Sequence, residues 1–108
     1  MLVDLSQLEA ALNVFGTLDP GRLPLHHIQV FLMVARKGKA TYRELETELN
    51  LTNASISRSV TGLSDEANHR LKPLGLLAIE RDPAEGRRFK VKLTPKGKAL
   101  AKALEAIK

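Results

Sequence analysis

Two short helical segments separated by a tight turn constrain the fold of this chain more than any other feature. The stretch TYRE at 41–44 fits a capping box, in which the first and last side chains satisfy backbone N–H groups at a helix start. Thr52 fits the cap of a second helix that begins directly after Asn50-Leu51. Helices at about 41–49 and 52–64 predict a helix-turn-helix, a motif whose second helix enters the major groove of DNA.

The second of these helices, LTNASISRSVTGL at 51–63, has few large inward residues and many small polar ones. Its outer face suits close approach to DNA, because short hydroxyl and amide groups can bond phosphates and base edges. Arg58 is long enough to reach a guanine edge or a phosphate. Ser59 is expected to project towards the flank and to be solvated. The predicted DNA-contacting side chains of this recognition helix are Thr52, Asn53, Ser55, Ser57 and Arg58.

A basic β-hairpin is predicted downstream, with strands at about 77–81 and 89–93. The second strand, FKVKL, alternates so that its apolar residues face inward and Lys90 and Lys92 face outward. Arg87 and Arg88 lie in the turn, where long side chains can reach a minor groove. The DNA contacts predicted for this wing, 81–92, are therefore Arg87, Arg88 and Lys90. A solvated hairpin is the alternative interpretation.

Three further helices are predicted, two before this region and one after it. The first is expected to end at Gly16, and a second helix should open at Pro24 with Ile28, Phe31, Leu32 and Ala35 on one face. A last helix begins after Thr94-Pro95. The two terminal helices carry surplus apolar stripes, which either close the monomer core or form a symmetric dimer interface. The predicted dimer residues are Leu5, Leu8, Leu12, Leu100, Leu104 and Ile107.

The predicted fold class is mainly α with a small β-hairpin (α+β), a winged helix-turn-helix with flanking N- and C-terminal helices. We expect one domain over 1–108, with the N-terminal helix in 1–20, the winged helix in 24–94 and the C-terminal helix in 95–108.

Positive charge is concentrated at the end of the chain. Residues 1–80 hold eight Lys/Arg and nine Asp/Glu, whereas residues 81–108 hold nine Lys/Arg and three Asp/Glu. This asymmetry favours a polyanion as partner, and nucleic acid before a membrane. No apolar run approaches the roughly 20 residues that span a bilayer. The N-terminus does not resemble a signal peptide, and there are no cysteines. A cytoplasmic, nucleoid-associated protein is expected.

Five motifs follow one another in the order seen in one known family. They are TYREL at 41–45, LTNASISR at 51–58, GLL at 75–77, DPAEGRR at 82–88 and LTPKG at 93–97. Together they make the segment from Thr41 to Leu100 resemble the MarR-type winged-helix regulators. The resemblance departs at the C-terminus, where one short helix stands in place of the family's long dimerisation helices.

The resemblance implies a homodimer on a pseudo-palindromic operator. It implies that Ser57 and Arg58 lie in the major groove and that Arg87 lies near the minor groove. It also implies that Asp82 supports the wing by pairing with a wing arginine.

The expected function is that of a sequence-specific double-stranded DNA-binding transcriptional regulator, most simply a repressor. The alternatives are a winged-helix protein-interaction module that inhibits or adapts a partner without DNA, and an origin-binding replication or partition protein. No catalytic motif, cofactor or metal site is expected, since His26 and His27 point in different directions on a helix. With four aromatic residues for a pocket, a small-molecule effector is not expected.

Overall fold

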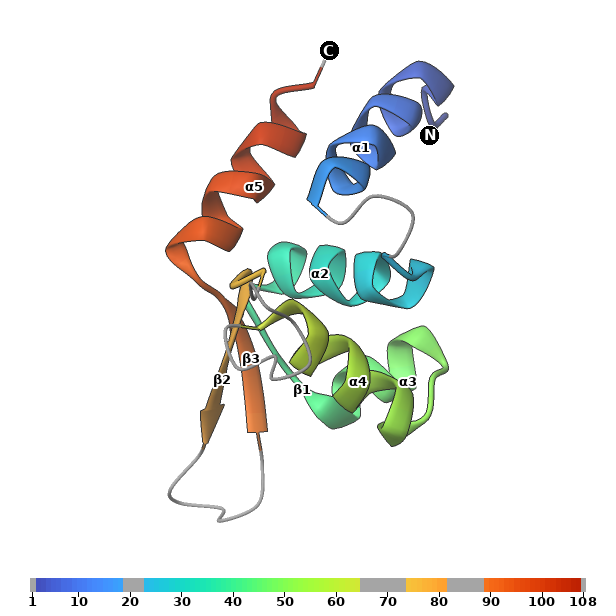
Figure 1. Ribbon diagram of the computed structural model, residues 1–108. Coiled ribbons are helices and arrows are strands. Elements are labelled where there is room, and N and C mark those ends of the chain that lie inside the picture. Colours follow the sequence, from blue (N-terminus) through green and yellow to red (C-terminus); the bar gives the residue numbers. More distant parts are fainter. Residues whose placement is uncertain (1, 19–22, 65–73, 82–88, 108) are drawn as a thin grey trace.

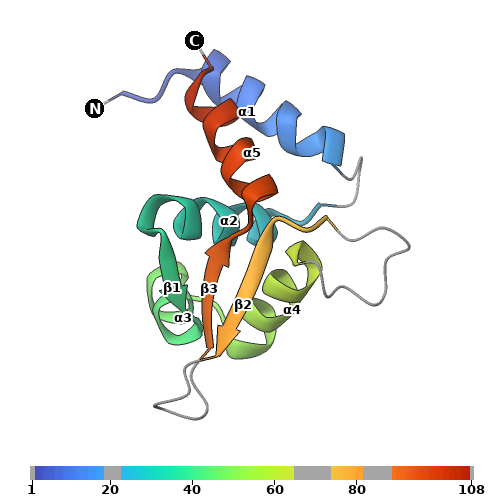
Figure 2. The same cartoon turned by 90° about the vertical axis from the view of Figure 1, so that its left-hand side faces the viewer.

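Five helices and a three-stranded sheet make up the computed structural model, which describes residues 2–18, 23–64, 74–81 and 89–107. In chain order they are α1 (Leu5–Leu18), α2 (Leu25–Lys37), β1 (Lys39–Thr41), α3 (Tyr42–Leu49), α4 (Asn53–Leu63), β2 (Leu77–Arg81), β3 (Phe89–Leu93) and α5 (Pro95–Glu105). Helices α2, α3 and α4 and the sheet form one body, and α1 and α5 extend from it towards the end where both termini lie (Figures 1 and 2). The predicted mainly helical winged-helix architecture is confirmed.

The sheet has the strand order β1-β3-β2, and both pairings are antiparallel. The two strands predicted for the wing have the expected bounds. The strand β1 was not predicted, because three residues are too short for an alternating pattern. It places Lys39 beside Lys92 and Thr41 beside Lys90, so the chain that enters α3 is part of the sheet.

Helix α2 lies at the centre of the core and packs against α3, α4, α5, β1 and β3. The buried apolar residues of the molecule are Phe15, Val30, Phe31, Met33, Val34, Ala40, Leu45, Ile56, Val60, Leu63, Leu74, Leu76, Leu77 and Val91. The stripe predicted for α2 is wrong at Leu32, which is 46% exposed, whereas Val30 and Val34 are fully buried. A helix surrounded by five elements buries more than one stripe, and this is why a single-face pattern misplaced its core side.

The ends of the first two helices differ slightly from the prediction. Helix α1 continues through Gly16 to Leu18, so the expected stop at Gly16 is wrong. A glycine inside a helix costs only about 1 kcal/mol, and the ring of Phe15 packs edge-on against Phe31 with centroids 5.6 Å apart. Pro24 has extended backbone angles and serves as N-cap, so α2 begins one residue later, at Leu25.

Main-chain hydrogen bonds join the end of α4, the start of β2 and the start of α5. The Leu76 N–H donates to the Leu63 carbonyl at 2.8 Å, and the Thr94 N–H donates to the Leu76 carbonyl at 3.0 Å. The Thr94 hydroxyl donates to the Gly75 carbonyl at 2.5 Å and accepts from the Gly97 N–H at 3.0 Å. A Cβ added at Gly97 would overlap the Leu76 carbonyl oxygen. We refer to this arrangement as the α4–α5 junction.

Candidate nucleic-acid interface

The turn between α3 and α4 is held by side-chain caps on both helices. The Thr41 hydroxyl accepts from the Glu44 N–H at 3.1 Å, and the Glu44 carboxylate accepts from the Thr41 N–H at 3.0 Å, which confirms the predicted capping box. Asn50 ends α3 in the left-handed region with φ of 54°, a conformation that Asn tolerates better than most residues. The Thr52 hydroxyl then caps α4 by accepting from the Ser55 N–H at 3.1 Å. The two helices therefore form the predicted helix-turn-helix.

The inner side of α4 attaches it to the core. Ile56, Val60 and Leu63 are at most 1% exposed, as their spacing predicted. Ser59 is 1% exposed, so the expectation that it is solvated is wrong. It lies three residues after Ile56, on the same side of the helix, and this spacing could have placed it correctly. Gly62 is also buried, and a Cβ there would lie 2.6 Å from Nε2 of His27 on α2. Small residues thus allow α4 to approach α2 closely.

The outer side of α4 carries the five predicted DNA-contacting side chains. Thr52, Asn53 and Arg58 are exposed, and Ser55 and Ser57 are half-buried. The Thr52 hydroxyl also donates to the Ser55 hydroxyl at 3.1 Å, so these two groups partly satisfy each other. Within the described residues no carboxylate forms an ion pair with Arg58. In the described part of the chain, its guanidinium therefore faces solvent without an ionic partner.

The wing strands present cations on one face of the sheet. Lys90 and Lys92 on β3 are exposed, as predicted, and Lys39 on β1 lies opposite Lys92. The Glu80 carboxylate lies 3.5 Å from both Lys39 Nζ and Lys92 Nζ. Its pKa is lowered, first by the charge of Lys39 and then by that of Lys92. Lys92 is thus partly neutralised within the molecule.

The rest of the predicted wing site cannot be placed. Asp82, Arg87 and Arg88 lie outside the described residues, and so does any pairing between Asp82 and a wing arginine. At the edge of the described wing, the Arg81 guanidinium lies over the Phe89 ring, 5.5 Å from its centroid.

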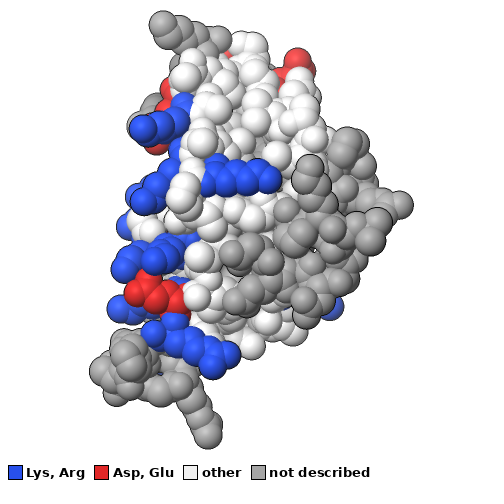
Figure 3. Space-filling view, turned by 60° about the vertical axis from the view of Figure 1, so that its left-hand side comes forward, with Lys and Arg blue, Asp and Glu red and all other residues white. Residues whose placement is uncertain are grey.

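The cations of the sheet and of α5 belong to one surface. In Figure 3, Lys and Arg side chains follow one edge of the molecule over both elements, with few acidic groups among them. The exposed lysines of these elements are Lys39, Lys90, Lys92, Lys96, Lys98 and Lys102. Positive charge from the sheet and α5 is therefore gathered on this face, which favours contact with a polyanion.

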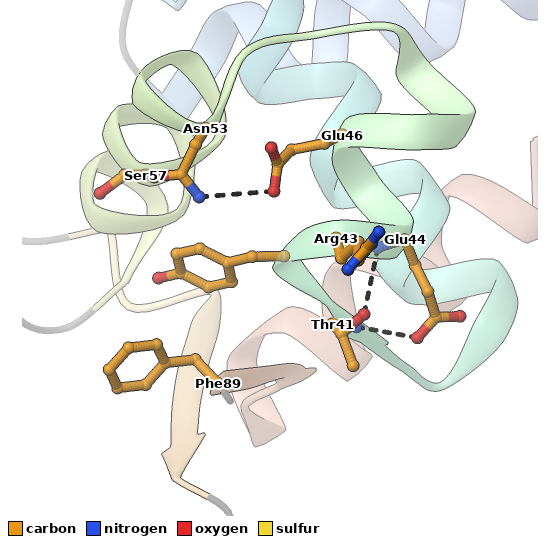
Figure 4. A pocket seen from close by; sticks show the side chains of 8 residues that line it. Thr41, Arg43, Glu44, Glu46, Asn53, Ser57 and Phe89 are labelled. Atoms are coloured by element: carbon orange, nitrogen blue, oxygen red, sulfur yellow. Dashed lines mark hydrogen bonds between the residues drawn. The ribbon is translucent and has the colours of Figure 1, made fainter. Parts of the chain in front are cut away.

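A cavity of about 680 Å³ separates α4 from the wing and the start of α3. We call it the α4–wing pocket; its lining residues are Thr41, Tyr42, Arg43, Glu44, Glu46, Asn53, Ser57 and Phe89. The Tyr42 and Phe89 rings stand together with centroids 5.7 Å apart. Figure 4 shows Phe89 among the side chains that line the pocket. Across the pocket, Asn53 Nδ2 donates to the Glu46 carboxylate at 3.4 Å.

Sequence reasoning did not assign six of these lining residues to the site: Thr41, Tyr42, Arg43, Glu44, Glu46 and Phe89. The alternation of apolar and charged residues in FKVKL predicted that Phe89 faces the core, whereas the side chain is half-buried and lines the pocket. The signal available in the sequence was the position of Tyr42 and Arg43, which open the helix that precedes α4.

The other glutamates of α3 are engaged with α2. Lys37 Nζ lies 3.2 Å from the Glu44 carboxylate and 2.9 Å from that of Glu48, and Arg36 lies 3.5 Å from Glu48. The pKa of Glu44 is lowered by the Thr41 N–H and then by Lys37, and the pKa of Lys37 is raised by Glu48 and Glu44. These charges join α3 to α2.

The terminal helices divide their predicted dimer residues between core and surface. Leu5, Leu8 and Leu12 on α1 are 77%, 45% and 43% exposed. Leu100 and Leu104 on α5 are half-buried against the core, and half-buried Ile107 follows the end of the helix. An exposed apolar stripe therefore remains on α1.

The described residues show neither a membrane span nor a metal-binding cluster. No helix in them combines the length and apolar character needed to cross a bilayer. They bring together no group of three His, Cys, Asp or Glu side chains able to hold a metal ion.

The fold is found in solved structures of transcriptional regulators. No protein-family model matches the chain, and no curated protein matches its sequence. A mutant MarR from E. coli complexed with operator DNA is similar with a TM-score of 0.65 and 17% identity, over 95% of this chain and 69% of that one. PcaV from Streptomyces coelicolor in complex with its natural ligand is similar with a TM-score of 0.63 and 22% identity, over 99% of this chain and 77% of that one. BpsR from Bordetella bronchiseptica is similar with a TM-score of 0.62 and 20% identity, over 95% of this chain and 73% of that one. Its DNA binding is regulated by 6-hydroxynicotinic acid.

Proposed function

Starting from the winged-helix fold that this chain shares with the MarR-type regulators, we propose that it is a double-stranded DNA-binding transcriptional regulator and not an enzyme. The observation that carries the proposal is the outer side of α4. It combines exposed Arg58, which has no ionic partner among the described residues, with short polar side chains on a helix fixed to the core by its inner side. A solvated helix would gain more from paired Glu and Lys than from this surface.

In the proposed complex, residues 52–64 enter the major groove, with Thr52, Asn53, Ser55, Ser57 and Arg58 towards the DNA. The wing, 81–92, lies along the adjacent backbone and minor groove, where Lys90 and, in the turn, Arg87 and Arg88 supply positive charge. Asp82 would support that turn. A protein that covers promoter DNA in this way acts most simply as a repressor and resides with the nucleoid.

We also propose that the protein works as a homodimer. The exposed stripe of α1, Leu5, Leu8 and Leu12, is its main support, because apolar residues at helical spacing favour burial against a second surface. Leu100, Leu104 and Ile107 would border this interface. Light scattering should give twice the chain mass at micromolar concentration, and Leu8→Lys should return the monomer. A monomeric wild type would contradict the dimer.

The earlier expectation that no small-molecule effector acts on this chain finds no support. Two of the similar structures concern regulators with small ligands, 6-hydroxynicotinic acid for BpsR and a natural ligand for PcaV. An effector therefore belongs among the conditions to be varied in binding experiments.

The decisive experiment is duplex binding as a function of salt. A random-sequence library should yield an enriched operator, and fluorescence anisotropy should show affinity falling steeply between 50 and 200 mM salt, as expected when phosphate contacts release counterions. Absence of duplex binding at low salt would reject the proposal in favour of a protein-interaction module. Enrichment of origin DNA instead of promoter DNA would indicate a replication or partition role.

A further inference from the structure

Glu46 places a carboxylate on the surface where DNA binding needs positive charge. It is half-buried and lines the α4–wing pocket together with Asn53 and Ser57. In Figure 4 its side chain extends from α3 towards α4, and the dashed line joins it to Asn53. The hydrogen bond from Asn53 Nδ2 is 3.4 Å long. An acidic group thus stands beside the first residue of the recognition helix.

The charge of Glu46 is not neutralised by a neighbouring cation in the described part of the chain. Glu44 and Glu48 share Lys37. Glu80 is paired with Lys39 and Lys92. By contrast, the partner found for Glu46 is a neutral amide. Among these carboxylates, Glu46 is therefore the one whose field acts most directly on a ligand approaching α4.

This position opposes the binding of any phosphate backbone. The first turn of a helix attracts anions through its unpaired N–H groups and its dipole, and Asn53 is the first residue of α4. A carboxylate within hydrogen-bonding distance of Asn53 repels a phosphate at the same place, whatever the DNA sequence. Sequence-independent binding is weakened as a result.

The same carboxylate determines how the Asn53 amide is turned. A carboxylate accepts hydrogen bonds only, so the Asn53 nitrogen and not its oxygen must face Glu46. When the N–H anti to that oxygen makes this bond, the second N–H and the oxygen share the opposite edge of the amide. This is the pair with which an asparagine recognises the N7 and N6 groups of adenine.

We propose that Glu46 is a specificity-determining residue of this interface. It lowers affinity for arbitrary DNA and holds Asn53 in the orientation that reads an adenine edge. The inference rests on the proposed function and adds to it a residue that touches no phosphate. It also predicts an adenine at the operator position that Asn53 contacts.

The test compares two duplexes of equal length, the selected operator and a random sequence, with wild type, Glu46→Gln and Glu46→Ala. Removing the charge should tighten binding to the random duplex about fivefold, the effect of one like-charge pair about 4 Å apart in water. At the operator this gain should be offset, because the Glu46→Gln amide can donate as well as accept and no longer fixes the orientation of Asn53, so operator affinity should stay close to that of wild type. Glu46→Ala should also lose affinity for the operator. In both variants the ratio of the two dissociation constants should shrink.

The matched control is Glu48→Gln, which makes the same change of net charge on the same helix but outside the α4–wing pocket. Glu48→Gln should change the ratio of the two dissociation constants by less than about twofold, since an exposed ion pair contributes little free energy. A ratio in Glu46→Gln and Glu46→Ala that stays within twofold of wild type overturns the inference while leaving the proposed function intact. A wild type that binds neither duplex overturns both.

A second measurement examines the hydrogen bond without DNA. In the ¹⁵N-labelled free protein, the side-chain amide signals of Asn53 should move in Glu46→Ala and remain unchanged in Glu48→Gln. Unmoved signals in Glu46→Ala would overturn the orienting role of Glu46.

Discussion

Helices α3 and α4 are neighbours of similar length, each capped by a threonine, yet their polar side chains have different partners. On α3, Glu44 and Glu48 are paired with Lys37 of α2. On α4, the exposed Arg58 has no carboxylate partner among the described residues. A face whose charges are satisfied inside the molecule serves stability, whereas a face whose donors remain available serves recognition. The comparison predicts that substitutions of Glu44 and Glu48 on α3 alter unfolding and that substitutions on outer α4 alter binding.

The largest effect should come from detaching α4 from the core. Ile56→Ala removes a fully buried side chain and should lower the free energy of unfolding by about 2–5 kcal/mol. Urea denaturation followed by circular dichroism measures it. Thr47→Ala, at an exposed position of α3, is the control and should stay within about 0.5 kcal/mol. A loss below about 1 kcal/mol for Ile56→Ala would show that α4 is not held by this contact.

The next effect concerns Arg58. Arg58→Ala should weaken operator binding by about 1–3 kcal/mol and relax the preference at one base pair, while unfolding changes little. Anisotropy with the operator and its single-base variants measures this. Arg36→Ala, an exposed arginine on α2 paired with Glu48, should leave binding unchanged. Equal losses in both variants would mean that the comparison between the faces is wrong.

Smaller effects are expected from removing the threonine caps of α3 and α4, one of which should alter stability alone and the other both stability and DNA binding. Thr41→Ala and Thr52→Ala each remove a cap and should cost about 1 kcal/mol in the free energy of unfolding. Only Thr52→Ala should also weaken operator binding, because it lies on the proposed interface. Thr52→Ser keeps the capping oxygen and should restore most of the stability. Loss of operator affinity in Thr41→Ala would argue against this division.

The smallest effect should be the acid sensitivity of the α3 side. The pKa of Glu44 is lower in the folded protein, so its stabilisation is present above the ordinary glutamate pKa of about 4.3 and is lost as the pH falls through the lowered value. The thermal unfolding midpoint of wild type should therefore decrease as the pH is lowered through that range. The midpoint of Glu44→Gln should decrease less steeply with pH. The difference should be small, because the Glu44 side chain is 45% exposed. Parallel pH curves would contradict this role of Glu44.

Much of the fold could be predicted because its local signals agree with one another. The capping box, the cap at Thr52 and the alternation of FKVKL each fix an element boundary by short-range hydrogen bonding or by the side-chain period of a strand. The strand β1 and the burial of Leu32 were missed or misplaced because they depend on what the rest of the chain places beside them. Tertiary neighbours, and not local pattern, decide such positions.

The candidate site was predicted in part for the same reason. The outer residues of α4 follow from helical spacing alone. Glu46 and Phe89 enter the site only because α3 and β3 meet beside α4, which no single segment encodes. Ser59 was misplaced because its polarity was given more weight than its position, although a buried hydroxyl is compatible with close packing of two helices.

The α4–α5 junction also bears on how such a sequence can diverge. Two of its three links between elements run from one peptide group to another, so replacing the side chains of Leu63 or Leu76 leaves the bonding groups in place. The exceptions are Thr94, whose hydroxyl makes the third link, and Gly97, where an added methyl group would strike the Leu76 carbonyl. The angle between α5 and α4 therefore depends on peptide groups more than on the side chains that α5 presents to solvent, so substitutions on that surface should leave the angle unchanged.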